Sequence, residues 1–451
     1  MSTLTSIDKQ DESPMQVDIL IHAKWIIPVL PAYLVHENHA IAIRDKKIIT
    51  IVSSDVARAS ISAQQSFELA NHVLIPGLVN AHGHAAMSLF RGIADDIPLK
   101  QWLEERIWPL EEKFVNEKFV FDGTTLAIAE MIASGTTCFA DMYFFPDAAA
   151  KAALDAGMRA QLASPVLDFP TVWAQDADEY ILKATQLHDD YRNSDLVHTC
   201  FGPHAPYTVS DAPLQKILTL AEELDIPIHM HVHETAQEIS DAVSSDGRRP
   251  IERLRQLGLI SPRLLCVHAT DLTDAEMQLL AEHGASVIHC PQSNLKLASG
   301  FCEVARLVKK GVNVALGTDG SASNNDLNMF AEMQTAALLA KGVAKDASAI
   351  PAQQALAMAT INGAKALGLD ALIGSLEAGK FADITAVDMN CMNSTPFYDP
   401  TSQLVYATQA SQVSHVWCNG NLLLDEGELT RLDAAIIKES ATHWQQQITR
   451  A

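Results

Sequence analysis

The hydrophobic and polar positions of the chain form two different textures. Residues 17–75 alternate short apolar runs with polar turns such as "RDKK", which is typical of short strands. A similar texture returns near the other end, in "FADITAVDM" and "VSHVWCNGNLLLDEGEL". Neither fragment has enough strands for a stable sheet. We therefore expect the two to pair as one small, discontinuous β-sandwich domain.

The middle of the chain repeats an apolar strand, a loop and a stretch with helical periodicity. Eight such strands predict an α/β fold of the (β/α)8 TIM-like barrel type. No GxGxxG fingerprint follows any of them, which disfavours a doubly wound sheet. The candidate strands are 75–80, 136–141, 158–163, 198–202, 227–231, 264–268, 285–289 and 313–317.

These patterns predict how the chain divides. The expected parts are 1–74 for the first sandwich part, 75–370 for the barrel, 371–430 for the second sandwich part and 431–451 for a C-terminal helix.

Charge and composition limit the classes of molecule that the protein is expected to bind. The 451 residues hold 32 Lys and Arg against 55 Asp and Glu, a formal charge of −23, so nucleic acids and anionic membranes are disfavoured. A small neutral or cationic substrate is easier to accommodate. The seven cysteines are scattered, mostly in apolar runs, which is typical of a reduced protein. No signal pattern or long apolar run occurs, so we expect a soluble cytoplasmic protein.

Four polar patches each lie at the end of a predicted barrel strand or just after it. They are His82 and His84 in "NAHGH", the histidines of "HMHVHET", His268 in "VHAT" and Asp319 in "LGTDG". Catalytic groups of such barrels come from the carboxyl ends of the strands and the loops after them. Three imidazoles and a carboxylate form a ligand set that suits zinc. The patches together predict a metal-dependent hydrolase.

The spacing of the histidines does not identify the third histidine ligand of the metal. His82 and His84 are two residues apart, so both rings point to the same side of an extended segment. By the same parity His229, His231 and His233 share a face, and the residues alone do not choose among them. Each remaining candidate also has a structural alternative. Asp319 could be a turn residue, Glu234 a first-turn helix carboxylate and His268 a core histidine.

The set is complete for hydrolysis. A metal would lower the pKa of a bound water from about 15.7 toward roughly 7. Glu234 could take the proton of that water and pass it to a ring nitrogen, while His268 orients the nucleophile. Asp319 would both bind the metal and relay a proton, and the leaving group would depart as ammonia.

Several long stretches resemble the amidohydrolase superfamily and, within it, the 5'-methylthioadenosine/S-adenosylhomocysteine deaminase family. They run in order through nearly the whole chain. They are "PGLVNAHGHAAMSLFRGIADDIPLKQWLEERIWPLE", "FGPHAPYTVS", "HMHVHETAQE", "HCPQSNLKLASGF", "LGTDGSASNNDLNM" and "GSLEAGKFADITAVD".

The resemblance implies a site. It assigns one divalent ion, usually zinc, to His82, His84, His231 and Asp319, and catalytic roles to Glu234, His268 and Asp319. The three-residue step to Glu234 is what selects His231. Binuclear relatives use a carboxylated Lys on strand four, and "LVHTCFGPH" has none. A mononuclear centre and deamination are therefore favoured.

The resemblance also implies substrate contacts. It places a ribose-binding carboxylate at Glu111 and further pocket residues at His204, Trp102 and Glu234. The alternative for Glu111 is a solvated acidic pair with Glu112. Relatives that handle the homocysteine moiety carry an Arg on strand three, where this chain has Ser164 and Pro165, so we expect a preference for 5'-methylthioadenosine. Arg159 is the candidate replacement for that Arg.

The leading hypothesis is deamination of an adenine nucleoside at C6, converting 5'-methylthioadenosine to 5'-methylthioinosine. S-adenosylhomocysteine and adenosine are further candidate substrates. One alternative is a deaminase or chlorohydrolase of a free heterocycle such as a guanine-like or triazine ring. Another is a catalytically silent scaffold, which is disfavoured because every ligand is present. We also expect a homo-oligomer.

Overall fold

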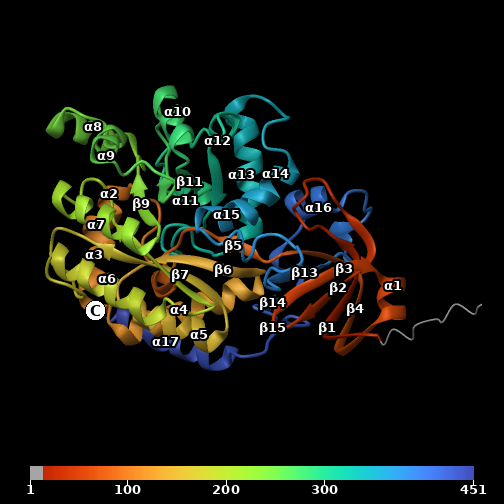
Figure 1. The fold of residues 1–451 in the computed structure, drawn as a ribbon. Coiled ribbons are helices and arrows are strands. Elements are labelled where there is room, and N and C mark those ends of the chain that lie inside the picture. The colour runs from red at the N-terminus through yellow and green to blue at the C-terminus, as the bar shows by residue number, and fades with distance from the viewer. Residues whose placement is uncertain (1–13, 451) are drawn as a thin grey trace, which may run out of the picture.

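The computed structural model of the protein describes residues 14–450. The first thirteen residues of the expected 1–74 part lie outside the described residues, as does Ala451 of the expected terminal helix. Most of the segment searched for a signal pattern also lies there. The described chain forms a barrel with a separate sheet beside it (Figure 1).

The barrel consists of eight parallel strands, each hydrogen-bonded to the next in chain order. The two end strands also meet, because the Ala81 N–H donates to the Leu316 carbonyl at 2.9 Å. The (β/α)8 prediction is therefore confirmed. The strands are β5 (Leu78–Asn80), β6 (Thr136–Met142), β7 (Arg159–Val166), β8 (Val197–Pro203), β9 (Ile228–Val232), β10 (Leu264–His268), β11 (Ser286–His289) and β12 (Asn313–Leu316).

The barrel strands are covered on both faces, which explains why most of their residues are apolar. Every residue of β6, β7, β9 and β10 is buried. Capping residues mark where helices between the strands begin and end, as in the helix after β10. The helix α10 (Asp274–His283) begins with a capping box of Thr273 and Glu276 and ends at Gly284, whose φ is +70°.

Helices surround the barrel and are numbered in chain order (Figure 1). The helices after β5 are α4 (Glu117–Ala133), α5 (Pro146–Ala156), α6 (Ala177–Tyr191), α7 (Asp211–Leu224), α8 (Ala236–Asp246), α9 (Pro250–Leu257), α10, α11 (Pro291–Lys296), α12 (Val304–Lys309), α13 (Met329–Ala344), α14 (Ala352–Met358) and α15 (Ile361–Ala366). A further segment leads from β5 to α4 through a 3₁₀ turn (Ala85–Phe90), α2 (Leu99–Trp102), a π-helical turn (Leu103–Ile107) and α3 (Trp108–Phe114).

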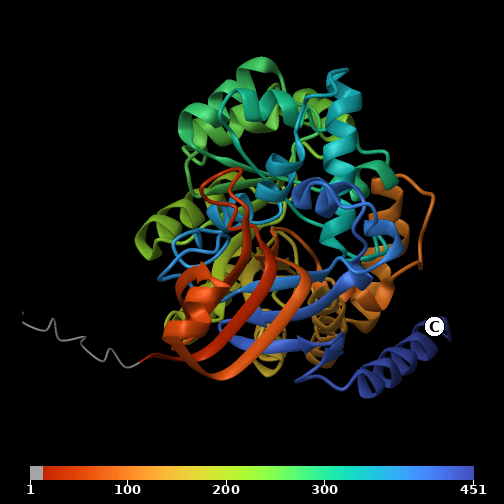
Figure 2. The same ribbon diagram turned by 90° about the vertical axis from the view of Figure 1, so that its right-hand side faces the viewer.

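The two terminal fragments form one eight-stranded sheet, which Figure 2 shows with its red and blue strands side by side. Its central link is β4, which pairs in parallel with β1 and antiparallel with β13. In spatial order the strands are β16 (Glu428–Leu429), β15 (Asn421–Asp425), β14 (Val413–Cys418), β13 (Ile384–Asp388), β4 (Ile61–Pro76), β1 (Met15–Ile26), β2 (His36–Arg44) and β3 (Lys47–Ser53). The short helices α1 (Ser54–Ser60) and α16 (Pro400–Tyr406) flank these segments.

The expected fold class, a barrel with a smaller domain assembled from both ends of the chain, is confirmed. The exact domain limits stay predictions. The terminal helix α17 (Ala434–Thr449) returns to the barrel, where the Trp444 indole N–H donates to Asp122 of α4 at 2.7 Å. Between residues 14 and 450, no helix combines the length and the apolar character needed to cross a bilayer.

Candidate active site

The residues singled out at strand ends meet at one rim of the barrel. His82 and His84 follow β5, His231 lies in β9, His268 ends β10 and Asp319 follows β12. The Asp319 N–H donates to the His82 carbonyl at 3.0 Å, so the first and last loops are joined beside the cluster. The barrel topology thus brings together side chains that lie up to 237 positions apart.

Four donor atoms converge in this cluster. The Nε2 atom of His82 lies 3.2 Å from that of His231 and 3.4 Å from Oδ1 of Asp319. The Nε2 atom of His84 lies 3.2 Å from the same Asp319 oxygen. Ligands at zinc-bond lengths of 2.0–2.1 Å in a tetrahedron are about 3.3 Å apart. Each of these three spacings matches that value. The possible metal donors fall into two groups that share His82, one with His84 and Asp319 and the other with His231 and His268.

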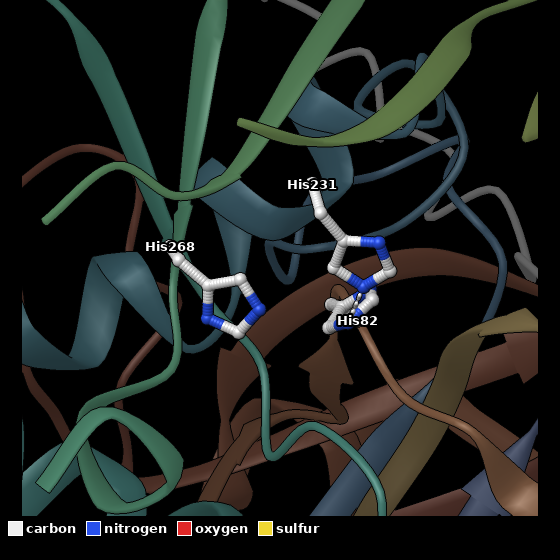
Figure 3. Close-up of side chains that lie close together, drawn as sticks. All are labelled: His82, His231 and His268. Carbon is white, nitrogen blue, oxygen red and sulfur yellow. Dashed lines mark hydrogen bonds between the residues drawn. The ribbon is translucent and has the colours of Figure 1, made fainter. Parts of the chain in front are cut away.

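Two of the three rings are held in orientation by backbone carbonyls, so that Nε2 faces the cluster. The Nδ1–H of His84 donates to the Met142 carbonyl at 2.6 Å, and that of His231 to the His204 carbonyl at 2.8 Å. Figure 3 shows the rings of His231 and His82 meeting at their nitrogens, with His268 facing them from the neighbouring strand. Burial, with the neighbouring imidazoles, holds the pKa of His231 well below its usual value. That ring is neutral and can donate to a metal.

Asp319 supplies the negative charge. Its Oδ2 accepts hydrogen bonds from the hydroxyls of Ser293 at 2.6 Å and Ser323 at 2.9 Å. Burial alone would raise the pKa of this carboxyl, but the hydrogen bonds with His82 and His84 hold it well below its usual value. The φ of Asp319 is +63°, in the left-handed region that non-glycine residues seldom occupy. Such strain is typical of functional loops.

A close backbone approach helps to place the first ligand. A Cβ atom added to Gly317, at the end of β12, would lie 2.8 Å from both the backbone nitrogen and the Cβ of His82. Only glycine therefore allows the loop after β12 to pass against His82.

Glu234 and His268 lie close to each other beside the cluster of donor atoms. The Glu234 carboxylate lies 3.7 Å from Nε2 of His268, whose Nδ1 pairs with the Asn294 amide oxygen at 2.9 Å. Burial raises the pKa of the Glu234 carboxyl, and the positive field of His268 opposes the shift. A carboxyl with a raised pKa can both take up and release a proton near neutral pH.

A cavity of about 580 Å³ opens above the cluster, and its wall includes His84, His231, Glu234, His268 and Asp319. The other residues predicted to contact a substrate line the same cavity: Trp102, Glu111 and His204. The segment between β5 and α4 supplies two of them, as well as the apolar residues Leu99, Leu103, Ile107 and Trp108.

Glu111 is not a solvated partner of Glu112. Its Oε1 accepts a hydrogen bond from the Tyr143 hydroxyl at 2.7 Å. Burial raises the pKa of Glu111 to about 7, and the Tyr143 hydrogen bond opposes that rise. The Trp102 indole N–H is buried and has no partner within residues 14–450.

Three residues that sequence reasoning did not assign also belong to this region. Tyr143 positions Glu111, as just described. Asp141 accepts a hydrogen bond from the Ala85 N–H at 2.7 Å and so holds the segment after His84. His229 meets His82 at 2.9 Å. The repeated histidines of "HMHVHET" were the only signal for His229, and "FADMYF" gave none for Asp141 or Tyr143.

Arg159 does not replace the missing strand-three Arg. It lies at the start of β7, fully buried, and donates to the Asp383 carboxylate at 3.2 Å. That position ties the barrel to β13 of the sheet, since Asp383 immediately precedes this strand. The cavity lining contains no Arg or Lys among the residues that the structure describes. The suggestion that Arg159 might serve there is therefore wrong.

Comparison with known proteins agrees with this architecture. The model of the amidohydrolase family matches residues 73–423. A 5-methylthioadenosine/S-adenosylhomocysteine deaminase from Saccharophagus degradans is 52% identical over 96% of this chain and 97% of its own, and one from Teredinibacter turnerae is 51% identical over 96% and 98%. A crystal structure of an adenosine deaminase from Xanthomonas campestris with bound zinc has a TM-score of 0.96 and 47% identity, covering 97% of this chain and 100% of that one. The chain belongs to the amidohydrolase family and is a relative of its 5-methylthioadenosine/S-adenosylhomocysteine deaminases.

Proposed function

We propose that this protein is a zinc-dependent aminohydrolase that deaminates adenine nucleosides at C6. Its preferred substrate is 5'-methylthioadenosine, which it converts to 5'-methylthioinosine and ammonia. The observation that carries the proposal is a pair of metal-donor groups that share His82, one with His84 and Asp319 and one with His231 and His268. They lie beside Glu234 in the wall of a cavity that also holds Glu111. The names of the deaminases and the zinc-bound neighbour described above support the same assignment.

The donor set would hold one zinc ion through His82, His84, His231 and Asp319. When bound, zinc supplies Lewis-acid activation of a water near neutral pH. Glu234 accepts a proton from the attacking water and transfers it to a nitrogen of the purine ring, while His268 holds the water oxygen. As the C6–O bond forms, Asp319 accepts the second proton of the water and passes it to the amino group, and the C6–N bond then breaks to release ammonia. No electron transfer is required.

A substrate panel tests the proposal. We expect ammonia release from adenosine, 5'-methylthioadenosine and S-adenosylhomocysteine, but not from guanine or an aminotriazine. Sugar-binding groups such as Glu111 contribute only when a ribose is present. Turnover of the free heterocycles alone would support the alternative function and defeat the role of Glu111. A protein that stays below about one equivalent of divalent metal after repletion would instead be a scaffold.

The methylthio compound should be used more efficiently than S-adenosylhomocysteine. The cavity wall contains Pro165 and the apolar Phe169 and Val172, and among the described residues its lining includes no Lys or Arg to pair with a homocysteine carboxylate. A missing hydrogen bond to a charged group costs about 1.5–3 kcal/mol. We therefore expect kcat/KM to be at least about tenfold higher for 5'-methylthioadenosine.

A gain of cationic charge provides the matched control for this preference. Val172 is 39% exposed at the cavity wall, so Val172→Arg can place a guanidinium there without disturbing the core. The variant should raise the relative efficiency with S-adenosylhomocysteine. Equal efficiencies of the unchanged protein with both nucleosides would contradict the preference.

Removing the hydroxyl of Tyr143 should weaken sugar binding. In Tyr143→Phe the Glu111 carboxylate loses its donor, so its pKa rises further and less of it is ionised near pH 7. We expect KM for the nucleoside to increase about tenfold with little change in kcat. Steady-state kinetics with the 2',3'-dideoxy nucleoside is the control, because that compound lacks the hydroxyls. An equal rise in KM for both compounds would show that Tyr143 does not act through Glu111.

The proposal also covers the location of the protein, its partners and its oligomeric state. We expect the protein to act in the cytoplasm on a small-molecule nucleoside, without nucleic acid as a partner, since the formal charge is −23. We also expect a homo-oligomer, which sedimentation would reveal.

A further inference from the structure

His82 is oriented differently from the other two histidines of the cluster. His84 and His231 each direct Nδ1 to a backbone carbonyl, which can only accept a hydrogen bond. The Nδ1 atom of His82 instead lies 2.9 Å from Nε2 of another imidazole, His229. The orientation of one cluster histidine therefore depends on the state of a side chain that has no donor atom in the cluster.

The contact has a definite chemical requirement. A neutral imidazole binds a metal ion through its unprotonated nitrogen, so His82 must carry its proton on Nδ1 if Nε2 is to bind. That proton then needs an acceptor. His229 can accept it through Nε2 only when its own proton is on Nδ1. One pair of tautomers therefore satisfies both the hydrogen bond and the free lone pair of His82.

The surroundings hold the pair in place. Both side chains are fully buried, and their ring centroids are 5.0 Å apart. His229 comes from β9 and His82 from the loop after β5, strands that are not neighbours in the sheet. The contact therefore crosses the barrel interior beneath the cluster. The last histidine of the repeat, His233, directs its Nδ1 elsewhere, to the Asp271 carbonyl at 2.9 Å.

The required tautomer of His229 is unfavourable by itself. Its Nδ1 atom is buried and has no hydrogen-bond partner within residues 14–450. A buried polar atom without a partner costs free energy, and its presence in a folded protein calls for an explanation. Support of His82 across the barrel supplies one.

We propose that His229 is a positioning residue that fixes the tautomer and ring orientation of His82, so that Nε2 of His82 is free for a divalent ion. The inference rests on the proposed metal site and adds a residue to it that binds neither metal nor substrate.

Two variants of similar size separate this role from simple packing. His229→Gln keeps an acceptor near the position of Nε2, whereas His229→Leu fills the space without one. Zinc affinity is measured by competition with a chromophoric chelator, without any substrate. We expect His229→Leu to weaken zinc binding by about 10–100-fold, the usual effect of losing an outer-shell partner, and His229→Gln to restore most of it. Unchanged affinity in His229→Leu, or equal losses in both variants, would overturn the proposal.

Controls distinguish the other causes of a loss. His233→Leu removes a buried histidine of the same segment and should leave zinc affinity unchanged, since His233 has no contact with the cluster histidines. Thermal unfolding of the metal-free proteins reports changes in stability. If zinc does not bind to the unaltered protein, the proposed function fails, which is a different outcome from failure of the His229 role.

A second measurement observes the two rings directly in the unaltered protein. Imidazole ¹⁵N spectra of the unaltered metal-free protein, assigned with His82→Gln and His229→Gln, report the tautomer of each ring. We expect protons on Nδ1 of both His82 and His229. A proton on Nε2 of His229 would contradict the proposal.

Discussion

Glu234→Gln is expected to lose nearly all deaminase turnover while still binding its metal ion. The substitution preserves the size of a side chain that is 7% exposed, but the amide cannot carry a proton from water to the substrate. Loss of a general acid–base group typically costs about 10²–10⁴-fold in rate. The ligand atoms of the cluster belong to other residues, so zinc content should stay near that of the unaltered protein. Ammonia release measures the turnover, and metal analysis of the same preparation measures the zinc content.

The comparison needs a carboxylate that has no part in the chemistry. Glu222 is exposed on the outer helix α7, and Glu222→Gln should keep full turnover. If Glu234→Gln retains turnover within a few-fold, Glu234 is not the proton carrier. If it loses zinc as well, Glu234 contributes to the metal site instead.

The second large effect is expected for His82→Ala, which should lose both metal and turnover. The His82 ring is fully buried and lies within 3.4 Å of donor atoms of two other cluster residues. Removing it takes away a donor and leaves a space among the remaining polar groups. We expect zinc affinity to fall by more than the roughly 100-fold that follows loss of an outer-shell partner. Chelator competition measures the affinity, and ammonia release measures the turnover.

Replacing a histidine far from the cluster controls for the general effect of losing an imidazole side chain. His198 lies near the start of β8, at the opposite end of the barrel strands from the cluster. His198→Ala should retain both zinc and turnover. If His82→Ala binds zinc as tightly as the unaltered protein, the ligand assignment is contradicted.

The barrel was predictable because its strands are buried on both faces. Such strands are rich in apolar residues, and each of the eight observed barrel strands overlaps a predicted one. The closure of the barrel then places the loops after β5 and β12 side by side. The convergence of His82 with Asp319 follows from the fold class and their positions after strands.

The alternation of side chains along β9 did not identify which of its neighbouring histidines is the metal ligand. Alternation along a strand predicts that His229, His231 and His233 share a face. The strand ends at Val232, and the φ of His233 is +55°, so the alternation stops before the third histidine. His229 and His231 do share a face, but at different depths. Only His231 reaches the convergent donor atoms, whereas His229 meets His82 from behind.

Long-range pairings were also beyond the reach of sequence patterns. The parallel pairing of β1 with β4 depends on register between segments that have similar apolar alternation. Tyr143 reaches Glu111 from the loop after β6, and nothing local in either segment indicates that contact. The sequence made Arg159 a candidate for binding the substrate, but its side chain is buried against Asp383.

Anomalous diffraction from crystals of the zinc-loaded protein, recorded on both sides of the zinc absorption edge, tests the central claim most directly. The account predicts one peak of full occupancy, bonded to Nε2 of His82, His84 and His231 and to a carboxylate oxygen of Asp319. No peak at this rim, or a peak bound by other side chains, would contradict it.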